Sequence, residues 1–177
     1  RITREFTQQT ESGTTQFSLQ LSESLYNYYK DRTRVADYGA YTADTLDDSQ
    51  IKSLANTFKK YGNRHSHNSR EIVNHTIAWV QGMKYTQDKP ATGFNEYPKY
   101  PIETIYDRGG DCEDTSILLA EIFSEMGYET VLIDLPQAKH MAVGVAGEYD
   151  VDGAYYTKNG KRYYYIETTG SGWRVGE

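Results

Sequence analysis

The sequence predicts an α+β fold, in which several helices come first and a run of antiparallel strands follows the last of them. Three observations support this prediction. Apolar residues recur at helical spacing in segments before residue 127, β-rich segments begin at residue 129, and Asn159-Gly160 is a strong hairpin signal. We therefore expect the fold to contain helices packed on an antiparallel sheet.

The length of 177 residues fits one domain with a sizeable core. We expect a single domain over 1–177, with an N-terminal hairpin and helices over 1–99 and a catalytic core over 100–177. The chain starts at Arg1 without a methionine. We take it to be excised from a longer protein, and we expect a monomer.

The N-terminal half predicts a hairpin followed by three helices. Alternation of Phe6 and Phe17 with polar residues predicts strands over 3–9 and 15–21, joined by a turn at 11–13. Helical spacing predicts helices over 23–32, 49–61 and 70–82, with Asn68 or Ser69 as the cap of the third. Loops are expected over 33–47, 63–69 and 89–101.

The C-terminal half predicts one helix and then strands. The helix is expected over 112–126, closed by Gly127. Strands are expected over 129–135 and 140–146, and a hairpin over 155–165 turns at Asn159-Gly160.

Composition excludes some partners. A formal net charge of −6 and the lack of any long basic run disfavour nucleic acid. No stretch approaches the roughly 20 apolar residues of a membrane-spanning helix, so we expect no membrane contact within this segment. Seventeen tyrosines and few aliphatic residues favour an extracytoplasmic location, at the cell surface or secreted.

Cys112 is the only cysteine, so it forms no internal disulfide and no cysteine-rich zinc site. Its expected place is the first turn of a helix, capped by Asp111, with Asp114 three residues on. The positive end of the helix dipole favours a thiolate there, and Gly109 and Gly110 would allow tight backbone geometry and close approach by an extended substrate. The flanking carboxylates act in the opposite direction, so a reactive thiol needs a cationic partner.

His140 and Glu167 are the candidates for that partner and its support. His140 begins one expected strand and Glu167 ends the expected hairpin, so pairing of these strands would bring the carboxylate beside the imidazole. Such a carboxylate fixes the histidine tautomer. Taken singly, His140 could be a surface residue and Glu167 a solvated strand end.

The run from Gly109 to Asp114, the later His140 and the still later Glu167 resemble the transglutaminase-like superfamily. The resemblance covers about residues 100–173 and implies a papain-like core with a catalytic triad of Cys112, His140 and Glu167. Most of that family has Asp at the third position. The sequence Gly-Asp-Cys-Glu-Asp also resembles bacterial transglutaminase-like cysteine proteases of the periplasm, in which the flanking acids bind calcium; this maps calcium onto Asp111 and Glu113. Archaeal surface proteins contain similar domains.

This resemblance implies cysteine-dependent amide acyl transfer on a protein or peptide substrate, most simply by a peptidase or isopeptidase that requires no cofactor. Two alternatives stay open. One is a transglutaminase that cross-links proteins, and the other is a non-catalytic surface module that binds peptide or cell-wall material.

Two further groups of residues are interpreted as structural. His65, His67 and His75 match no zinc motif, so we expect them on a solvated loop and helix. The acidic run over 44–48 lacks the glycine and closing glutamate of a calcium loop. Its acids are better explained as helix N-terminal charge.

Overall fold

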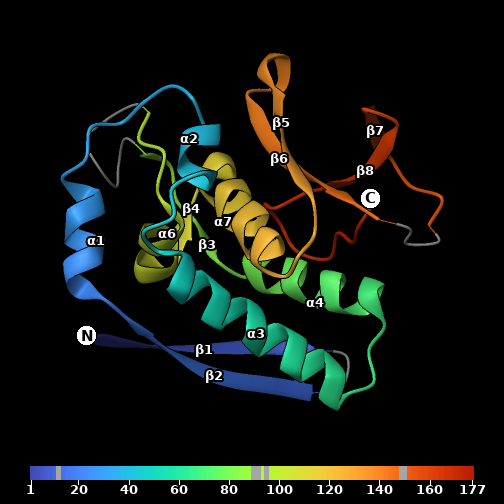
Figure 1. Cartoon of the computed structure of the whole chain (residues 1–177), viewed down its shortest axis with the longest axis horizontal. Helices are drawn as coiled ribbons and strands as arrows, with labels where there is room; N and C mark the ends of the chain where they lie inside the picture. The colour runs from blue at the N-terminus through green and yellow to red at the C-terminus, as the bar shows by residue number, and fades with distance from the viewer. Residues whose placement is uncertain (11–12, 89–92, 94–95, 148–150) are drawn as a thin grey trace.

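The computed structural model describes residues 1–10, 13–88, 93, 96–147 and 151–177 (Figure 1). The N-terminal elements are, in chain order, β1 (Ile2–Thr10), β2 (Gly13–Leu21), α1 (Glu23–Lys30), α2 (Gly39–Thr42), α3 (Asp48–Arg64), α4 (Ser69–Gln81) and β3 (Lys84–Tyr85). The later elements are α6 (Pro101–Asp107), β4 (Gly109–Gly110), α7 (Cys112–Glu125), β5 (Thr130–Leu135), η1 (Pro136–Ala138), β6 (His140–Ala146), β7 (Tyr155–Lys158) and β8 (Lys161–Ile166). The predicted α+β class is confirmed.

The four C-terminal strands form one antiparallel sheet of order β5-β6-β8-β7. β7 and β8 turn at Asn159 and Gly160, which both have positive φ, as the hairpin prediction requires. β6 therefore pairs directly with β8. β7 comes between them in the sequence but pairs with β8 on its other side, at the edge of the sheet. As a result, the start of β6 lies beside the end of β8.

Helix α7 lies at the centre of the molecule (Figure 1), where it packs on β5 and β6 and also on α3, α4 and α6. Every residue from Thr115 to Phe123 is buried. A helix that is buried on all sides must be apolar on nearly all sides, which explains its weak amphipathic pattern. This position holds the N-terminus of α7 firmly against the sheet.

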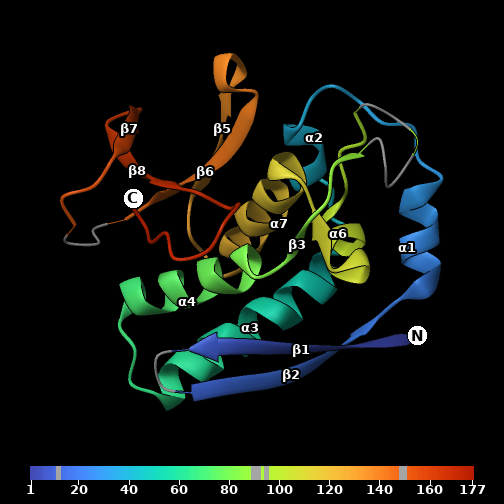
Figure 2. The ribbon, with the colours of Figure 1, turned by 180° about the vertical axis from the view of Figure 1, so that it is seen from behind.

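The N-terminal hairpin covers α3 and α4, away from the four-stranded sheet (Figure 2). Phe6 and Phe17 face inward from paired positions, and their rings contact Trp79 of α4. The ring of Phe17 also contacts Phe58 of α3. The two predicted strands are confirmed; residues 11 and 12 of the predicted turn lie outside the described residues.

Three elements differ from the predictions. The segment expected as a loop over 33–47 contains the short helix α2, and helix α6 follows the loop expected over 89–101. Residues 89–92 and 94–95 of that loop lie outside the described residues. The third difference is a short parallel pairing of β3 with β4, which joins Lys84 to Gly109 and Tyr85 to Gly110. Among the described helices, none combines the length and apolar character needed to cross a membrane.

Candidate active site

Cys112 is the first residue of α7, and a reciprocal cap fixes the turn before it. The side chain of Asp111 accepts from the amide of Asp114, and the side chain of Asp114 accepts from the amide of Asp111. The predicted capping arrangement is confirmed. It satisfies two backbone donors at a helix end, where such donors have no intrahelical acceptor.

The structure shows the tight backbone geometry that the sequence predicts for Gly109 and Gly110, while the approach of a substrate stays a prediction. A Cβ on Gly109 would lie 2.3 Å from the carbonyl oxygen of Lys84, and a Cβ on Gly110 would lie 2.4 Å from the Cβ of Asp114. The close neighbours are thus the protein's own β3 strand and its own helix cap. The glycines let the chain pass between them.

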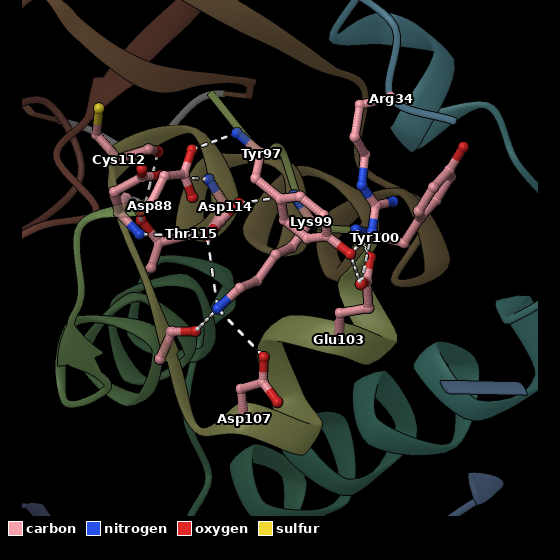
Figure 3. Close-up of polar contacts among 12 residues, drawn as sticks. Arg34, Asp88, Tyr97, Lys99, Tyr100, Glu103, Asp107, Cys112, Asp114 and Thr115 are labelled. Carbon is pink, nitrogen blue, oxygen red and sulfur yellow. Dashed lines mark hydrogen bonds and ion pairs between the residues drawn. The ribbon is translucent and has the colours of Figure 1, made fainter. Parts of the chain in front are cut away.

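Beneath this cap, Lys99 forms a buried network (Figure 3). Its Nζ donates to the carbonyl of Gly109 at 2.9 Å and lies 3.3 Å from Asp107 Oδ2 and 3.8 Å from Asp114 Oδ2. Its backbone amide donates to Asp114 Oδ1 at 2.7 Å. Lys99 therefore holds the loop before α6 against the start of α7. In Figure 3 the sulfur of Cys112 points away from this network.

Cys112 as a whole residue is 8% exposed, and its thiol donates to Glu113 Oε2 at 3.1 Å. Burial raises its pKa to about 12, and the hydrogen bond and charge of Glu113 act in the same direction. The backbone amide of Met141 offsets part of this rise. In this conformation burial and neighbouring acids therefore outweigh the helix dipole, and the acids act on the thiol pKa in the direction that the sequence predicts.

His140 and Glu167 are brought together as the strand pairing predicts. β6 pairs with β8 so that Val143 lies opposite Ile166. Continuing this register past the end of β8 puts Glu167 on the same face as His140. The imidazole Nε2 lies 2.7 Å from Glu167 Oε2.

Glu167 is held by three further hydrogen bonds. Its Oε1 accepts from the amide and from the hydroxyl of Thr169, both at 2.8 Å, and its Oε2 accepts from the Tyr165 hydroxyl at 3.2 Å. Burial raises the pKa of Glu167, but the bonds from Thr169 and the adjacent His140 outweigh burial, so the net pKa is lowered. An ionised carboxylate only accepts, so Nε2 of His140 carries the proton and Nδ1 of the neutral ring carries the lone pair.

No hydrogen bond joins Cys112 to His140 among the described residues. The amide of Met141, which follows His140 directly, nevertheless acts on the thiol. The start of β6 therefore lies beside the start of α7, while the thiol itself is turned toward Glu113.

A group of three carboxylates lies next to the thiol. Asp88, Asp111 and Glu113 each offer an oxygen atom, and these atoms all lie within 4.8 Å of one another. Burial, followed by the charges of neighbouring acids, raises the pKa of Asp111; burial also raises that of Asp88. Carboxylates that repel one another in a buried place suit a hard divalent cation such as calcium.

Sequence reasoning missed Asp88, Tyr165 and Thr169. Asp88 follows β3, and the pairing of β3 with β4 brings it close to Asp111. No local sequence pattern predicts this pairing. Tyr165 and Thr169 are each two residues from Glu167, so strand alternation and a short side-chain-to-backbone turn could have indicated them.

The histidine cluster does not form a metal site in the part of the chain that the structure describes, where each group of metal-ligating side chains contains carboxylates only. The ring of Tyr61 stacks on His75 at 4.2 Å and contacts His65 at 4.3 Å between centroids. These histidines pack as aromatic rings.

Comparisons with known proteins relate the chain to a family. The family model described as a transglutaminase-like domain matches residues 49–167, a segment that includes Cys112, His140 and Glu167. No curated protein matches the sequence. Two similar solved structures are of Legionella pneumophila LapG. The calcium-bound one is 21% identical, with 68% of this chain and 72% of that chain covered and a TM-score of 0.42. The other is 19% identical, with the same coverage and a TM-score of 0.41.

Proposed function

Because this chain belongs to the family of transglutaminase-like domains, we propose that it is a cysteine-dependent amidase acting on protein or peptide substrates. Cys112 is the nucleophile, His140 the general base and acid, and Glu167 the residue that orients His140. The observation that carries the proposal is the 2.7 Å bond between His140 Nε2 and Glu167 Oε2, with the carboxylate fixed on its other side by Thr169.

The proposed reaction starts with proton transfer from the thiol to Nδ1 of His140. In this proposal the proton transfer activates the sulfur for attack. Sulfur bonds to the amide carbonyl carbon, and the carbonyl oxygen becomes an oxyanion. The amide of Cys112 lies at the start of α7 and is a donor without an intrahelical acceptor, so it is suited to bind this oxyanion.

The imidazolium then gives its proton to the departing amine as the carbon–nitrogen bond breaks. An acyl thioester on Cys112 remains. His140 next takes a proton from water, whose oxygen attacks the thioester and releases the acid and the thiol. Glu167 stabilises the imidazolium in each half of the reaction without taking up the proton itself.

Asp88, Asp111 and Glu113 are the residues that would hold calcium in this proposal. A bound calcium ion would supply positive charge next to the thiol. The residues fit such an ion because their oxygens converge within 4.8 Å and because Asp111 is 8% exposed. We also propose a location outside the cytoplasm, on the basis of the tyrosine-rich composition described above.

The test uses a peptide library and an electrophilic thiol probe. The purified protein is expected to cleave a subset of peptides and to be labelled at Cys112. Cys112→Ser and His140→Ala are expected to lose cleavage, and His140→Ala also loses rapid labelling. His65→Ala serves as the matched control, because His65 is an exposed histidine on the loop after α3.

Two outcomes would change the proposal. If Cys112 in both the wild type and His140→Ala reacts at the rate of a cysteine in an unstructured peptide, the chain is a binding module and the catalytic role is wrong. If added lysine peptides appear in covalent amide products in place of hydrolysis, the acceptor is an amine and the protein is a cross-linking transglutaminase.

A further inference from the structure

A second group of carboxylates lies where the start of α3 meets the third turn of α7. Asp47, Asp48 and Glu121 each offer an oxygen, and these oxygens all lie within 4.8 Å of one another. Asp47 is 0% exposed and Glu121 is 3% exposed. Glu121 is nine residues beyond Cys112, a separation of about 14 Å along a helix, so this group is distinct from the one beside the thiol.

Glu121 is the unusual member, because neither of its carboxylate oxygens has a hydrogen-bond partner and both are buried. A buried polar group without a partner is costly, and a buried charge without a partner is more so. The carboxylate oxygens that lie within 4.8 Å of Glu121 belong to Asp47 and Asp48, which are acids themselves. In its present surroundings the side chain lacks a positive partner.

The neighbouring residues do not supply that partner. Asp47 accepts from the hydroxyl of Tyr29 at 3.0 Å and from the amide of Ile102 at 3.2 Å, both uncharged donors. The nearby Arg32 is paired with Asp44. Within the described ranges, no lysine, arginine or histidine lies within ion-pair distance of Asp47, Asp48 or Glu121.

We propose that Asp47, Asp48 and Glu121 bind a calcium ion that joins α3 to α7. Calcium binds carboxylate oxygens at about 2.3–2.6 Å, so two oxygens on one ion lie at most about 5 Å apart, which this group satisfies. Asp48 is half-buried and opens the group toward solvent, where water completes the coordination. Helix N-terminal charge, the explanation expected from the sequence, accounts for Asp48 but leaves the buried Glu121 unexplained.

The experiment measures calcium bound per chain after the protein has been stripped with a chelator. Glu121→Gln keeps the shape of the side chain and is expected to bind one equivalent fewer than the wild type. Glu125→Gln is the matched control, because it removes the same charge one turn further along α7 and is expected to bind as the wild type does. The double variant Asp88→Asn/Glu113→Gln removes the group beside the thiol and is expected to retain one equivalent.

Thermal melting gives a second readout. Calcium at 100 times its dissociation constant is expected to raise the melting temperature of the double variant by roughly 5–11 °C, and this rise should vanish when Glu121→Gln is added. If that combined variant does not fold, Asp48→Asn in the same background tests the same site. It removes one charged ligand and should weaken calcium binding at least about tenfold, which is about 1.4 kcal/mol.

The proposal is overturned if Glu121→Gln binds as many equivalents as the wild type, or if the double variant binds no calcium. Either result would mean that Glu121 is simply a buried protonated acid. Probe labelling of Cys112 is expected to persist in Glu121→Gln. Failure of this site therefore leaves the proposed chemistry standing. Peptide-like labelling of Cys112 in both the wild type and His140→Ala would refute that chemistry and leave this site standing.

Discussion

Replacing Glu167 by glutamine reverses the hydrogen-bonding requirement at one oxygen of a tightly held side chain. The backbone amide of Thr169 donates to Oε1 at 2.8 Å and cannot become an acceptor. The amide carbonyl of the new glutamine must therefore take the Oε1 position, which puts its NH₂ group against His140 Nε2. That nitrogen can then only accept, so the imidazole proton moves to Nδ1, the atom that must be free to take the thiol proton.

We expect Glu167→Gln to lower kcat/KM by about 10⁴-fold, the scale found when the acid of a triad becomes an amide, or about 5 kcal/mol of transition-state stabilisation. Glu167→Ala removes the orienting bond without imposing the wrong tautomer, so it should lose less, roughly 10²-fold to 10³-fold. The expected order of activity is wild type, then Glu167→Ala, then Glu167→Gln.

The assay combines peptide cleavage with nitrogen NMR of the histidine ring. The spectra should show the Nε2-protonated tautomer in the wild type and the Nδ1-protonated tautomer in Glu167→Gln, with His140→Ala used to assign the signals. The reasoning fails if Glu167→Gln keeps the Nε2-protonated tautomer, or if it is more active than Glu167→Ala. The tautomer measurement is independent of any substrate.

Three further predictions concern stability. Lys99→Met should lower the free energy of unfolding by about 3–5 kcal/mol in denaturant titration, because it leaves Asp114 buried without its cation. The control is the same change at Lys161, which forms an exposed pair with Glu129. If the Lys99 change has as small an effect as the Lys161 change, the role of Lys99 is contradicted. Gly110→Ala should cost about 1–3 kcal/mol because the new methyl group meets Asp114, and an unchanged melting temperature would show that the cap can move aside. Burial lowers the pKa of His75 from 6.5 to about 4, so the unfolded chain takes up a proton at this residue before the folded chain does. The contribution of the neutral, buried His75 to the free energy of unfolding is therefore present above pH 6.5 and is lost as the pH falls toward 4. His75→Phe keeps the ring stacked on Tyr61 and should reduce this acid-side loss, so an unaltered pH profile would assign the loss to other groups.

Most of the C-terminal half could be predicted from the sequence because its signals are local. The capped helix at Cys112, the strand beginning at His140 and the Asn159-Gly160 turn all depend on residues within a few positions of one another. The family resemblance is likewise confirmed by the match over residues 49–167. The roles of Cys112, His140 and Glu167 stay predictions until the kinetics are measured.

Other features depend on contacts that a local pattern does not contain. Helix α6 had a usable start signal, since Pro101 occupies its first turn and Glu103 bonds back to the amide of Tyr100, but the prolines before it favoured a loop. The meeting of Asp88 with Asp111, and of Glu121 with Asp47, requires the packed fold. Burial of the thiol likewise depends on tertiary packing, and local patterns indicate only the opposing effects of the helix end and the flanking carboxylates on its pKa.

The parallel pairing of β3 with β4 also affects how this protein could diversify. The pairing uses backbone groups, including the bond from the Thr86 amide to the Gly110 carbonyl, so it places no demand on the side chains of β3. Tyr85 projects from this strand, is 55% exposed, and lies near enough to Cys112 for the two side chains to interact electrostatically. Mutation at position 85 can therefore reshape the surface beside Cys112 while the backbone that supports Cys112 is unchanged. Under the proposed function, this makes position 85 a favourable place for evolving or engineering new selectivity.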